Sequence, residues 1–232
     1  MTADSLSFGD AYAVYSGRVD DNDPHFHAAY QIVLSATQTA IVSNAQGEQW
    51  CGDAILVRPM STHALYCRDP VILIYIDPQA TLALDLADKL DMDDICNLPQ
   101  GVLPFDANSS AEEIAQQLHI ASQAGQSHVD PRLSKALKLL GADPGRTLIT
   151  DIAKRCGISE SRLRTLARQQ LGVPISTWLI WRKLERAAME LTHGLSLADA
   201  AGAGGFADQA HFSREMRRMF GITPREAASA VS

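Results

Sequence analysis

LSLADAAGAGGFADQAHFSREMRRMFGITP, residues 195–224, contains the clearest pattern in the chain. It predicts a short helix, a tight turn at Gly204–Gly205 and a second helix that begins after Asp208. Asp208 is a favourable cap, because its carboxylate can accept hydrogen bonds from the free backbone N–H groups of the first helical turn.

The second predicted helix has two different faces. Phe212, Met216 and Phe220 recur every four residues, so they predict a buried stripe. The opposite face is polar and cationic, and it carries Gln209, His211, Arg214, Arg217 and Arg218. A short helix, a glycine turn and a cationic helix are typical of a helix-turn-helix that enters the major groove of DNA.

The same unit occurs a second time, 49 residues earlier in the chain. Residues 147–174 read TLITDIAKRCGISESRLRTLARQQLGVP, with a glycine turn at Gly157 and a helix cap at Ser159. Residues 176–192, between the two units, contain no proline or glycine and predict one long helix. Two units joined in this way could place two recognition helices in successive major grooves, about 34 Å apart on B-DNA.

This pattern resembles the C-terminal DNA-binding domain of the AraC/XylS family of bacterial transcription regulators. The resemblance rests on Gly205–Phe206, on FSREMRRMFGITP at residues 212–224, on RKLERAAMEL at 182–191 and on IAKRCGIS at 152–159. It covers about 100 residues, and both half-motifs and the helix between them stand in the order of the family.

The resemblance implies roles for individual side chains on DNA. In the first recognition helix, Ser161, Arg164 and Thr165 would face base edges, and Arg162 and Arg168 would lie nearer the backbone. In the second helix, the implied base-facing residues are Gln209, His211 and Arg214, and the implied phosphate ligands are Arg217 and Arg218. Arginine suits both roles, because its planar guanidinium can pair with guanine O6 and N7 or with phosphate oxygens.

Charge is divided unevenly along the 232 residues, whose net charge is −7. Residues 131–232 hold 16 Lys and Arg against 9 Asp and Glu, a net charge of +7, whereas residues 1–130 hold 4 against 18, a net charge of −14. The basic part is attracted to phosphates and the acidic part is repelled from them. The sequence contains no apolar membrane span, no signal-peptide pattern and no paired cysteines, so we expect a cytoplasmic bacterial protein associated with the nucleoid.

The N-terminal part is predicted to be β-rich. Short strand-like runs occur at residues 30–43, 54–57, 64–67 and 71–76. HFHAAYQIVL at 25–34 and GDAILVRPMSTHAL at 52–65 resemble the cupin-type sensor domain that precedes the DNA-binding half in many AraC/XylS regulators.

We therefore expect an α+β protein of two domains. A cupin-like β-barrel with flanking helices would occupy residues 1–125, a linker residues 126–131, and an all-α double helix-turn-helix residues 132–232. Ser110 and Glu113 form a capping box that predicts a helix with Ile114 and Leu118 on one face. The resemblance implies that such a helix forms the interface of a homodimer.

Three histidines stand out in the predicted barrel. His25 and His27 are two residues apart, so on a strand they point to the same face, and His63 on a later strand could join them. Cupins use such a set to bind a divalent metal, with a glutamate that here corresponds to Gln31, a poorer ligand. Two interpretations stay open: a metal site at the three histidines, or an effector pocket lined by them and Gln31.

The leading prediction is a transcription regulator rather than an enzyme. Its expected partners are double-stranded promoter DNA, a small-molecule effector, a second copy of the chain and, for an activator, RNA polymerase. One alternative is a metal-dependent cupin enzyme, such as a dioxygenase, fused to a DNA-targeting domain; Gln31 argues against it. A DNA-repair methyl acceptor would need a reactive cysteine in a basic setting, but Cys156 is predicted to pack in the core.

The helix before the second turn is unusual in composition. Residues 198–205 read ADAAGAGG, and each glycine inside a helix costs about 1 kcal/mol relative to alanine. Small side chains also bury little area. We therefore expect the second unit to be the less stable of the two and to order fully on DNA.

Overall fold

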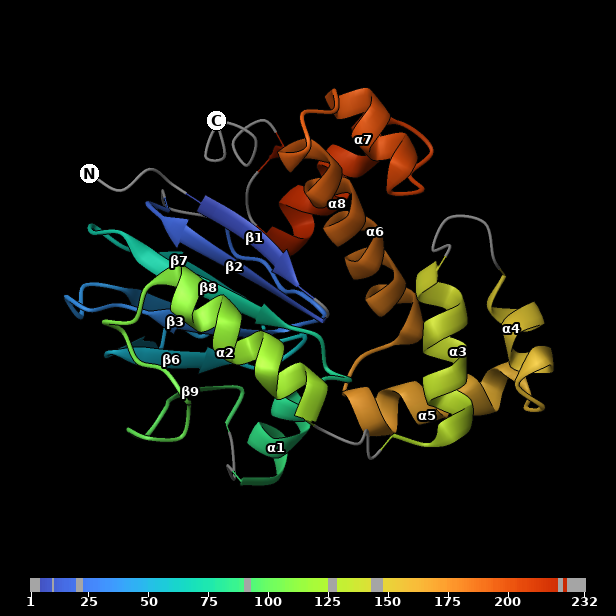
Figure 1. The fold of residues 1–232 in the computed structure, drawn as a ribbon, viewed down its shortest axis with the longest axis horizontal. Coiled ribbons are helices and arrows are strands. Elements are labelled where there is room, and N and C mark those ends of the chain that lie inside the picture. The colour runs from blue at the N-terminus through green and yellow to red at the C-terminus, as the bar shows by residue number, and fades with distance from the viewer. Residues whose placement is uncertain are drawn as a thin grey trace.

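The computed structural model describes residues 5–9, 11–19, 23–89, 93–124, 129–142, 148–220 and 223–224. An N-terminal part of antiparallel strands is followed by an all-helical C-terminal part, as the predicted α+β class requires (Figure 1). The strands are β1 Ser5–Gly9, β2 Tyr12–Gly17, β3 Tyr30–Leu34, β4 Ile41–Asn44, β5 Gln49–Cys51, β6 Ala54–Val57, β7 His63–Tyr66, β8 Val71–Ile76 and β9 Ile95–Asn97. The helices are α1 Thr81–Lys89, α2 Ala111–Ala124, α3 Pro131–Ala142, α4 Ile149–Arg155, α5 Glu160–Leu171, α6 Ile175–Thr192, α7 Leu197–Ala203 and α8 Gln209–Phe220.

The strands form two antiparallel sheets. One has the order β1-β2-β8-β3-β6-β9 and the other the order β5-β4-β7. An isolated bridge between His25 and His63 extends the smaller sheet. Among the described residues no strand pairing joins the two sheets into the closed cupin-like barrel that we expected. The strands of the smaller sheet are only three or four residues long, and they pair with one another rather than with the larger sheet.

Alternation along the strands gives the larger sheet two buried faces. One face packs under α1 and α2; its core includes Ile32, Leu34, Ile74, Leu86, Ile114 and Leu118. The other face packs toward the smaller sheet and the helical part; its core includes Val33, Val42, Ile55, Leu65 and Leu73. Figure 1 shows α2 lying across the larger sheet.

The predicted capping box is present at the start of α2. The Ser110 Oγ accepts from the Glu113 N–H at 3.2 Å, and the Glu113 carboxylate accepts from the Ser110 N–H at 2.8 Å. Half of the predicted linker, residues 126–128 of 126–131, lies outside the described residues, and α3 begins at its last residue, Pro131. Among the described helices, none has an apolar stretch that could span a lipid bilayer.

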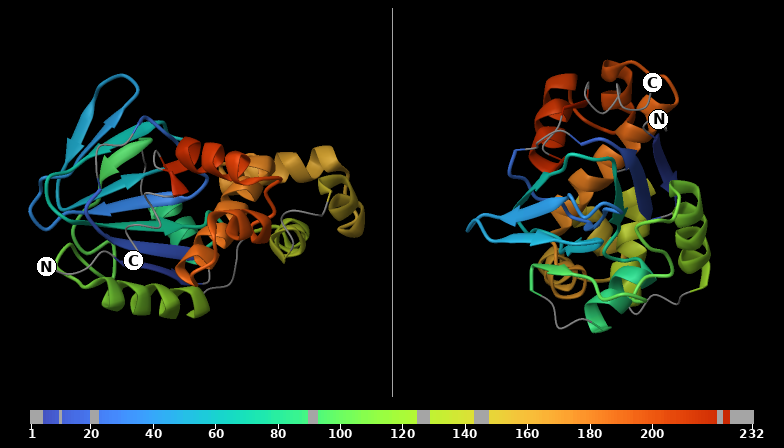
Figure 2. Two further views of the ribbon diagram at one scale, coloured as in Figure 1. Left: turned by 90° about the horizontal axis from the view of Figure 1, so that it is seen from above. Right: turned by 90° about the vertical axis from the view of Figure 1, so that its left-hand side faces the viewer.

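The repeat predicted in the C-terminal part is confirmed. Helices α5 and α8 are offset by 49 residues at both ends. Ser159 accepts a hydrogen bond from the Arg162 N–H at 3.1 Å, and Asp208 accepts one from the His211 N–H at 2.6 Å, so both predicted caps form. The two helix-turn-helix units flank the continuous helix α6, and Figure 2 shows α4 and α5 farthest from the sheets.

The buried stripe of α8 differs in one position from the prediction. Phe212 and Met216 are buried, but Met219 completes the stripe in place of Phe220. An α-helix advances 3.6 residues per turn, so a residue seven positions after Phe212 stays closer to its face than one eight positions after it. Phe220 is half-buried and turns toward the N-terminal part.

The glycines before α8 also have a role that helix propensity does not reveal. Gly205 has φ +81° and makes the left-handed turn residue. Gly204 has an ordinary helical φ, but a Cβ there would lie 2.7 Å from the Lys183 carbonyl oxygen and 2.8 Å from the Ala187 Cβ. The missing side chain thus permits the close approach of α7 to α6.

Candidate DNA-binding surface and histidine cluster

The predicted DNA-contacting side chains of α5 all lie on its exposed face. These are Ser161, Arg162, Arg164, Thr165 and Arg168, and the residues between them, Leu163, Leu166 and Ala167, are buried. Arg164 donates two hydrogen bonds to Glu160, at 2.9 and 2.6 Å, and Glu160 also accepts from Thr150. Arg162 and Arg168 have no ion pair with any described residue, so both guanidinium groups are available to phosphates.

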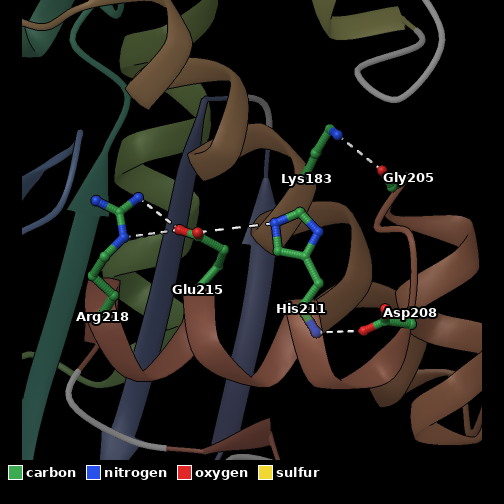
Figure 3. Close-up of polar contacts among 6 residues, drawn as sticks. All are labelled: Lys183, Gly205, Asp208, His211, Glu215 and Arg218. Atoms are coloured by element: carbon green, nitrogen blue, oxygen red, sulfur yellow. Dashed lines mark hydrogen bonds and ion pairs between the residues drawn. The ribbon is translucent and has the colours of Figure 1, made fainter.

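Polar contacts link the turn before α8 to α6, and others join side chains within α8 (Figure 3). Lys183 donates to the Gly205 carbonyl at 2.8 Å. Glu215 lies between His211, at 3.9 Å, and Arg218, which donates to it at 2.9 and 2.6 Å. The half-buried His211 ring also packs edge-on against another aromatic side chain, Phe206.

Two predicted phosphate ligands of α8, Arg217 and Arg218, are exposed to solvent but also contact the N-terminal part. Arg217 donates to the Asp23 carboxylate at 3.2 and 2.8 Å, and the Arg218 guanidinium lies 5.2 Å from the centre of the Phe26 ring. Both members of the Arg217–Asp23 pair are more than half exposed, so solvent screens it strongly. Arg214 and Gln209 remain exposed on the outer face. The C-terminal turn of α8 is therefore engaged with the β-rich part.

An aromatic cluster lies under this contact. The Phe220 ring at the end of α8 is 5.4 Å from Tyr75 of β8 and 5.2 Å from Trp181 of α6, between ring centres. Trp181 lies 5.6 Å from Tyr75 and 6.1 Å from His27. Sequence reasoning missed this cluster. The available signal was the pair of tryptophans three residues apart in the predicted connecting helix.

Asp77 makes a second contact between the β-rich N-terminal part and the helical C-terminal part, and the sequence did not indicate it. Asp77 is fully buried, accepts from the Trp178 indole N–H at 3.2 and 3.0 Å, and lies 3.8 Å from an Arg182 nitrogen. Burial raises the pKa of Asp77, and the nearby Arg182 and the hydrogen bonds from Gln79 and Trp178 oppose that rise. Asp77 therefore anchors α6 beneath β8.

The structure brings all four predicted barrel residues together. His25, His27, His63 and Gln31 are each at most 2% exposed. Each imidazole directs Nδ1 to a backbone carbonyl: His25 to Asp23 at 2.9 Å, His27 to Ala29 at 2.8 Å and His63 to Ser61 at 2.9 Å.

The opposite ring nitrogens converge. The Nε2 atoms of His27 and His63 lie 3.0 and 2.7 Å from the Gln31 Oε1, and the buried His25 Nε2 has no hydrogen-bond partner among the described residues. Burial lowers the pKa of His25 to about 4, lowers that of His27 and lowers that of His63 far below its usual value. All three are therefore neutral near pH 7.

Two surface hollows lie elsewhere. One of about 500 Å³ is lined by residues that include Gln38, Asn97, Phe105 and Asn108, and one of about 560 Å³ by residues that include Trp50, Met60 and Asp94. None of the four residues of the histidine cluster lines either hollow. Cys156, the cysteine of the basic part, is buried at the end of α4, as predicted.

Comparisons with known proteins agree on the helical part. A family model described as a helix-turn-helix domain matches residues 152–230. The transcriptional regulator ArgR of Pseudomonas aeruginosa is 32% identical over 48% of this chain and 34% of ArgR. The transcriptional activator NphR of Rhodococcus is 32% identical over 59% of this chain and 42% of NphR, and the arabinose operon regulatory protein of Escherichia coli is 34% identical over 34% and 27%. The chain thus covers less than half the length of these regulators.

Solved structures of one protein, ToxT, resemble the whole chain. ToxT from Vibrio cholerae superimposes with a TM-score of 0.61 at 14% identity, over 97% of this chain and 99% of ToxT. The arrangement of a β-rich N-terminal part and a double helix-turn-helix is therefore a fold that the two chains share. With its two half-motifs and its connecting helix, the helix-turn-helix half of the chain is therefore similar to the corresponding part of these transcription regulators.

Proposed function

We propose that this protein is a sequence-specific DNA-binding transcription regulator. The observation that carries the proposal is the pair of helix-turn-helix units on one rigid helix, each with a cationic outer face. Units related by a 49-residue repeat can present α5 and α8 to two major grooves on one side of a promoter duplex.

The exposed side chains divide by the contact they would make. Arg162 and Arg168 would bind phosphates, which set affinity and its dependence on salt. Arg214 and Gln209 would face base edges, where hydrogen bonds discriminate sequence. Arg217 and Arg218 would reach phosphates only after they leave Asp23 and Phe26, so DNA binding and the contact with the N-terminal part would compete for α8.

Selection from a random DNA pool, followed by affinity measurements on the enriched site, tests the proposal. Arg214→Ala should cost about 1–3 kcal/mol and relax the preference at one or two base pairs. Arg168→Ala should weaken binding to all sequences alike and reduce the slope of log affinity against log salt by about 1. The matched control is Arg68→Ala in the exposed turn after β7, which should bind as the wild type does. A failure to enrich any sequence would contradict the proposal.

The N-terminal part would act as the sensor. ToxT, which shares the fold, has been solved with an unsaturated fatty acid bound, which supports a ligand-responsive role for the corresponding part of this chain. We assign it a cupin-like sandwich, since its two antiparallel sheets enclose the histidine cluster.

Further partners belong to the same proposal. The chain would act in the bacterial cytoplasm on nucleoid DNA, and an activator would also contact RNA polymerase. A second copy would pack through α2, where Ile120 is 54% exposed. Ile120→Asp should then shift the full chain toward monomer in equilibrium sedimentation, and a wild type that is already monomeric would exclude this interface.

A further inference from the structure

We propose that His25, His27, His63 and Gln31 bind a divalent transition-metal ion, and that this ion controls the affinity for DNA. The second half of this inference rests on the regulator function proposed above. The first half stands on the geometry of the four side chains alone.

The hydrogen bonds of the cluster show which ring nitrogen of each histidine carries the proton. A backbone carbonyl only accepts hydrogen bonds, so each Nδ1 that lies 2.8–2.9 Å from one must carry the ring proton. Each neutral imidazole then presents a lone pair at Nε2. Two of these lone pairs face the Gln31 Oε1, which is itself an acceptor, at 3.0 and 2.7 Å. Acceptors that converge on one buried point repel one another unless a cation or a hydrogen-bond donor lies between them.

A rotated amide is the competing explanation. If the oxygen and nitrogen of Gln31 exchange places, the NH₂ group can donate to both His27 and His63, and the oxygen can accept from the Tyr75 hydroxyl, now 3.4 Å from the amide nitrogen. This rotation leaves the His25 Nε2 buried and without a partner. A metal ion satisfies all three imidazoles and the amide oxygen together, so the unpaired His25 favours the metal.

The donor set fits a transition metal. One ligand atom from each histidine lies within 4.8 Å of the others, and small side-chain rotations would bring them to the spacing of roughly 3.3 Å that bonds of about 2.1 Å to one ion require. Each Nδ1–H already donates to a carbonyl, the outer-shell contact that orients metal-bound histidines. Imidazole nitrogens suit Zn²⁺, Ni²⁺, Co²⁺ and Cu²⁺ rather than Mg²⁺ or Ca²⁺.

Gln31 makes the site suitable for a sensor rather than a permanent centre. Its amide oxygen is neutral, so the full charge of the ion stays uncompensated by the four ligands. A glutamate at this position would bind the ion more tightly and release it more slowly. The neutral ligand therefore favours reversible occupancy.

Two paths lead from the cluster to α8. The His27 ring contacts Trp181 and Tyr75, which hold Phe220 at the end of α8. His25 donates to the Asp23 carbonyl, and the Asp23 carboxylate holds Arg217. A movement of either imidazole onto an ion therefore reaches the helix that carries the phosphate ligands.

Titration of chelator-treated full-length protein with Co²⁺, followed by the visible d–d spectrum, tests the site itself. We expect one Co²⁺ per chain. Gln31→Glu should bind Co²⁺ at least 10-fold more tightly, and His25→Ala should bind it more than about 100-fold more weakly. His25→Ala removes no hydrogen bond of the Gln31 network, and circular dichroism checks that it folds. The control His119→Ala, exposed on α2, should bind as the wild type does.

Fluorescence anisotropy on the selected DNA site, with and without Zn²⁺, tests the control of DNA affinity. We expect the affinity to change at least 5-fold in the wild type and to stay unchanged in His25→Ala. Absence of a Co²⁺ spectrum in the wild type and in Gln31→Glu would overturn the metal site and support the rotated amide. Stoichiometric metal without a change in DNA affinity would overturn the control by metal. Absence of DNA binding in every form would instead refute the regulator function, and the Co²⁺ spectra would still decide the metal site.

Discussion

Alanine at Gly204 should destabilise the second helix-turn-helix, although alanine is the better helix former. The added Cβ would lie 2.7 Å from the Lys183 carbonyl oxygen and 2.8 Å from the Ala187 Cβ. Both neighbours belong to α6, and neither can rotate away, because one is backbone and the other is a methyl group fixed to it. Helix α7 must therefore move outward by roughly 0.5–1 Å, and overpacking of this kind costs about 1–3 kcal/mol. That cost exceeds the gain of at most about 1 kcal/mol from replacing a glycine.

Gly202 provides the matched control. It lies in the same helix, two residues earlier, and a Cβ there has no atom within 4 Å. Gly202→Ala should therefore raise the free energy of unfolding by up to about 1 kcal/mol, whereas Gly204→Ala should lower it by about 1–2 kcal/mol. Urea unfolding followed by far-UV circular dichroism measures both. Equal changes of the same sign would refute the idea that Gly204 is required for close packing.

Three further predictions concern stability. Asp77→Ala leaves the buried Trp178 N–H without an acceptor and should cost about 2–4 kcal/mol in urea unfolding, whereas Asp77→Asn keeps an acceptor and should cost less; equal losses would refute the role of the hydrogen bond. Because burial raises the folded-state pKa of Asp77 above its unfolded-state value, the stability of the wild type relative to Asp77→Asn should rise as the pH falls from the raised pKa toward the unfolded-state pKa, and it should not depend on pH above the raised pKa. Amide hydrogen exchange should be faster in α7 and α8 than in α4 and α5 without DNA, since α7 buries little more than Ala200 and Ala201; uniform protection would contradict this.

Local features of the helical part could be predicted because short-range chemistry determines them. Ser159 and Asp208 cap their helices through hydrogen bonds to the next few residues, so both caps could be predicted from the local sequence. The apolar stripe of α8 was predicted correctly at Phe212 and Met216 but not at Phe220, which packs against the N-terminal part. The convergence of the histidines also followed from strand periodicity, since His25 and His27 share a face and His63 pairs with His25 across an antiparallel bridge.

Contacts between the two parts could not be predicted in this way. Asp77 and Trp178 are 101 residues apart, and Arg217 and Asp23 are 194 apart, so their meeting depends on how the two parts pack. The close packing of Gly204 on α6, within the helical part, could not be predicted from the sequence either. The cost of this glycine to helix propensity is visible in the sequence, but the helix that approaches it most closely is known only from the fold.

Helix α8 has residues that face solvent, residues that pack within the helix-turn-helix and residues that contact the β-rich part. Its outer residue Arg214 faces solvent, its buried residues hold the helix-turn-helix together, and its last turn contacts the β-rich part through Arg217 and Phe220. If α8 binds DNA as proposed, a modest change in the N-terminal part could release its last turn, because the exposed ion pair between Arg217 and Asp23 contributes little on its own.

Hydroxyl-radical footprinting of the full chain on its selected DNA site tests whether both recognition helices contact DNA. We expect two protected patches on one side of the duplex, about one helical turn or 10–10.5 base pairs apart, one for α5 and one for α8. Arg168→Ala should weaken the first patch and Arg214→Ala the second. A single protected patch, or protection that neither substitution changes, would contradict a double helix-turn-helix that uses both of its recognition helices.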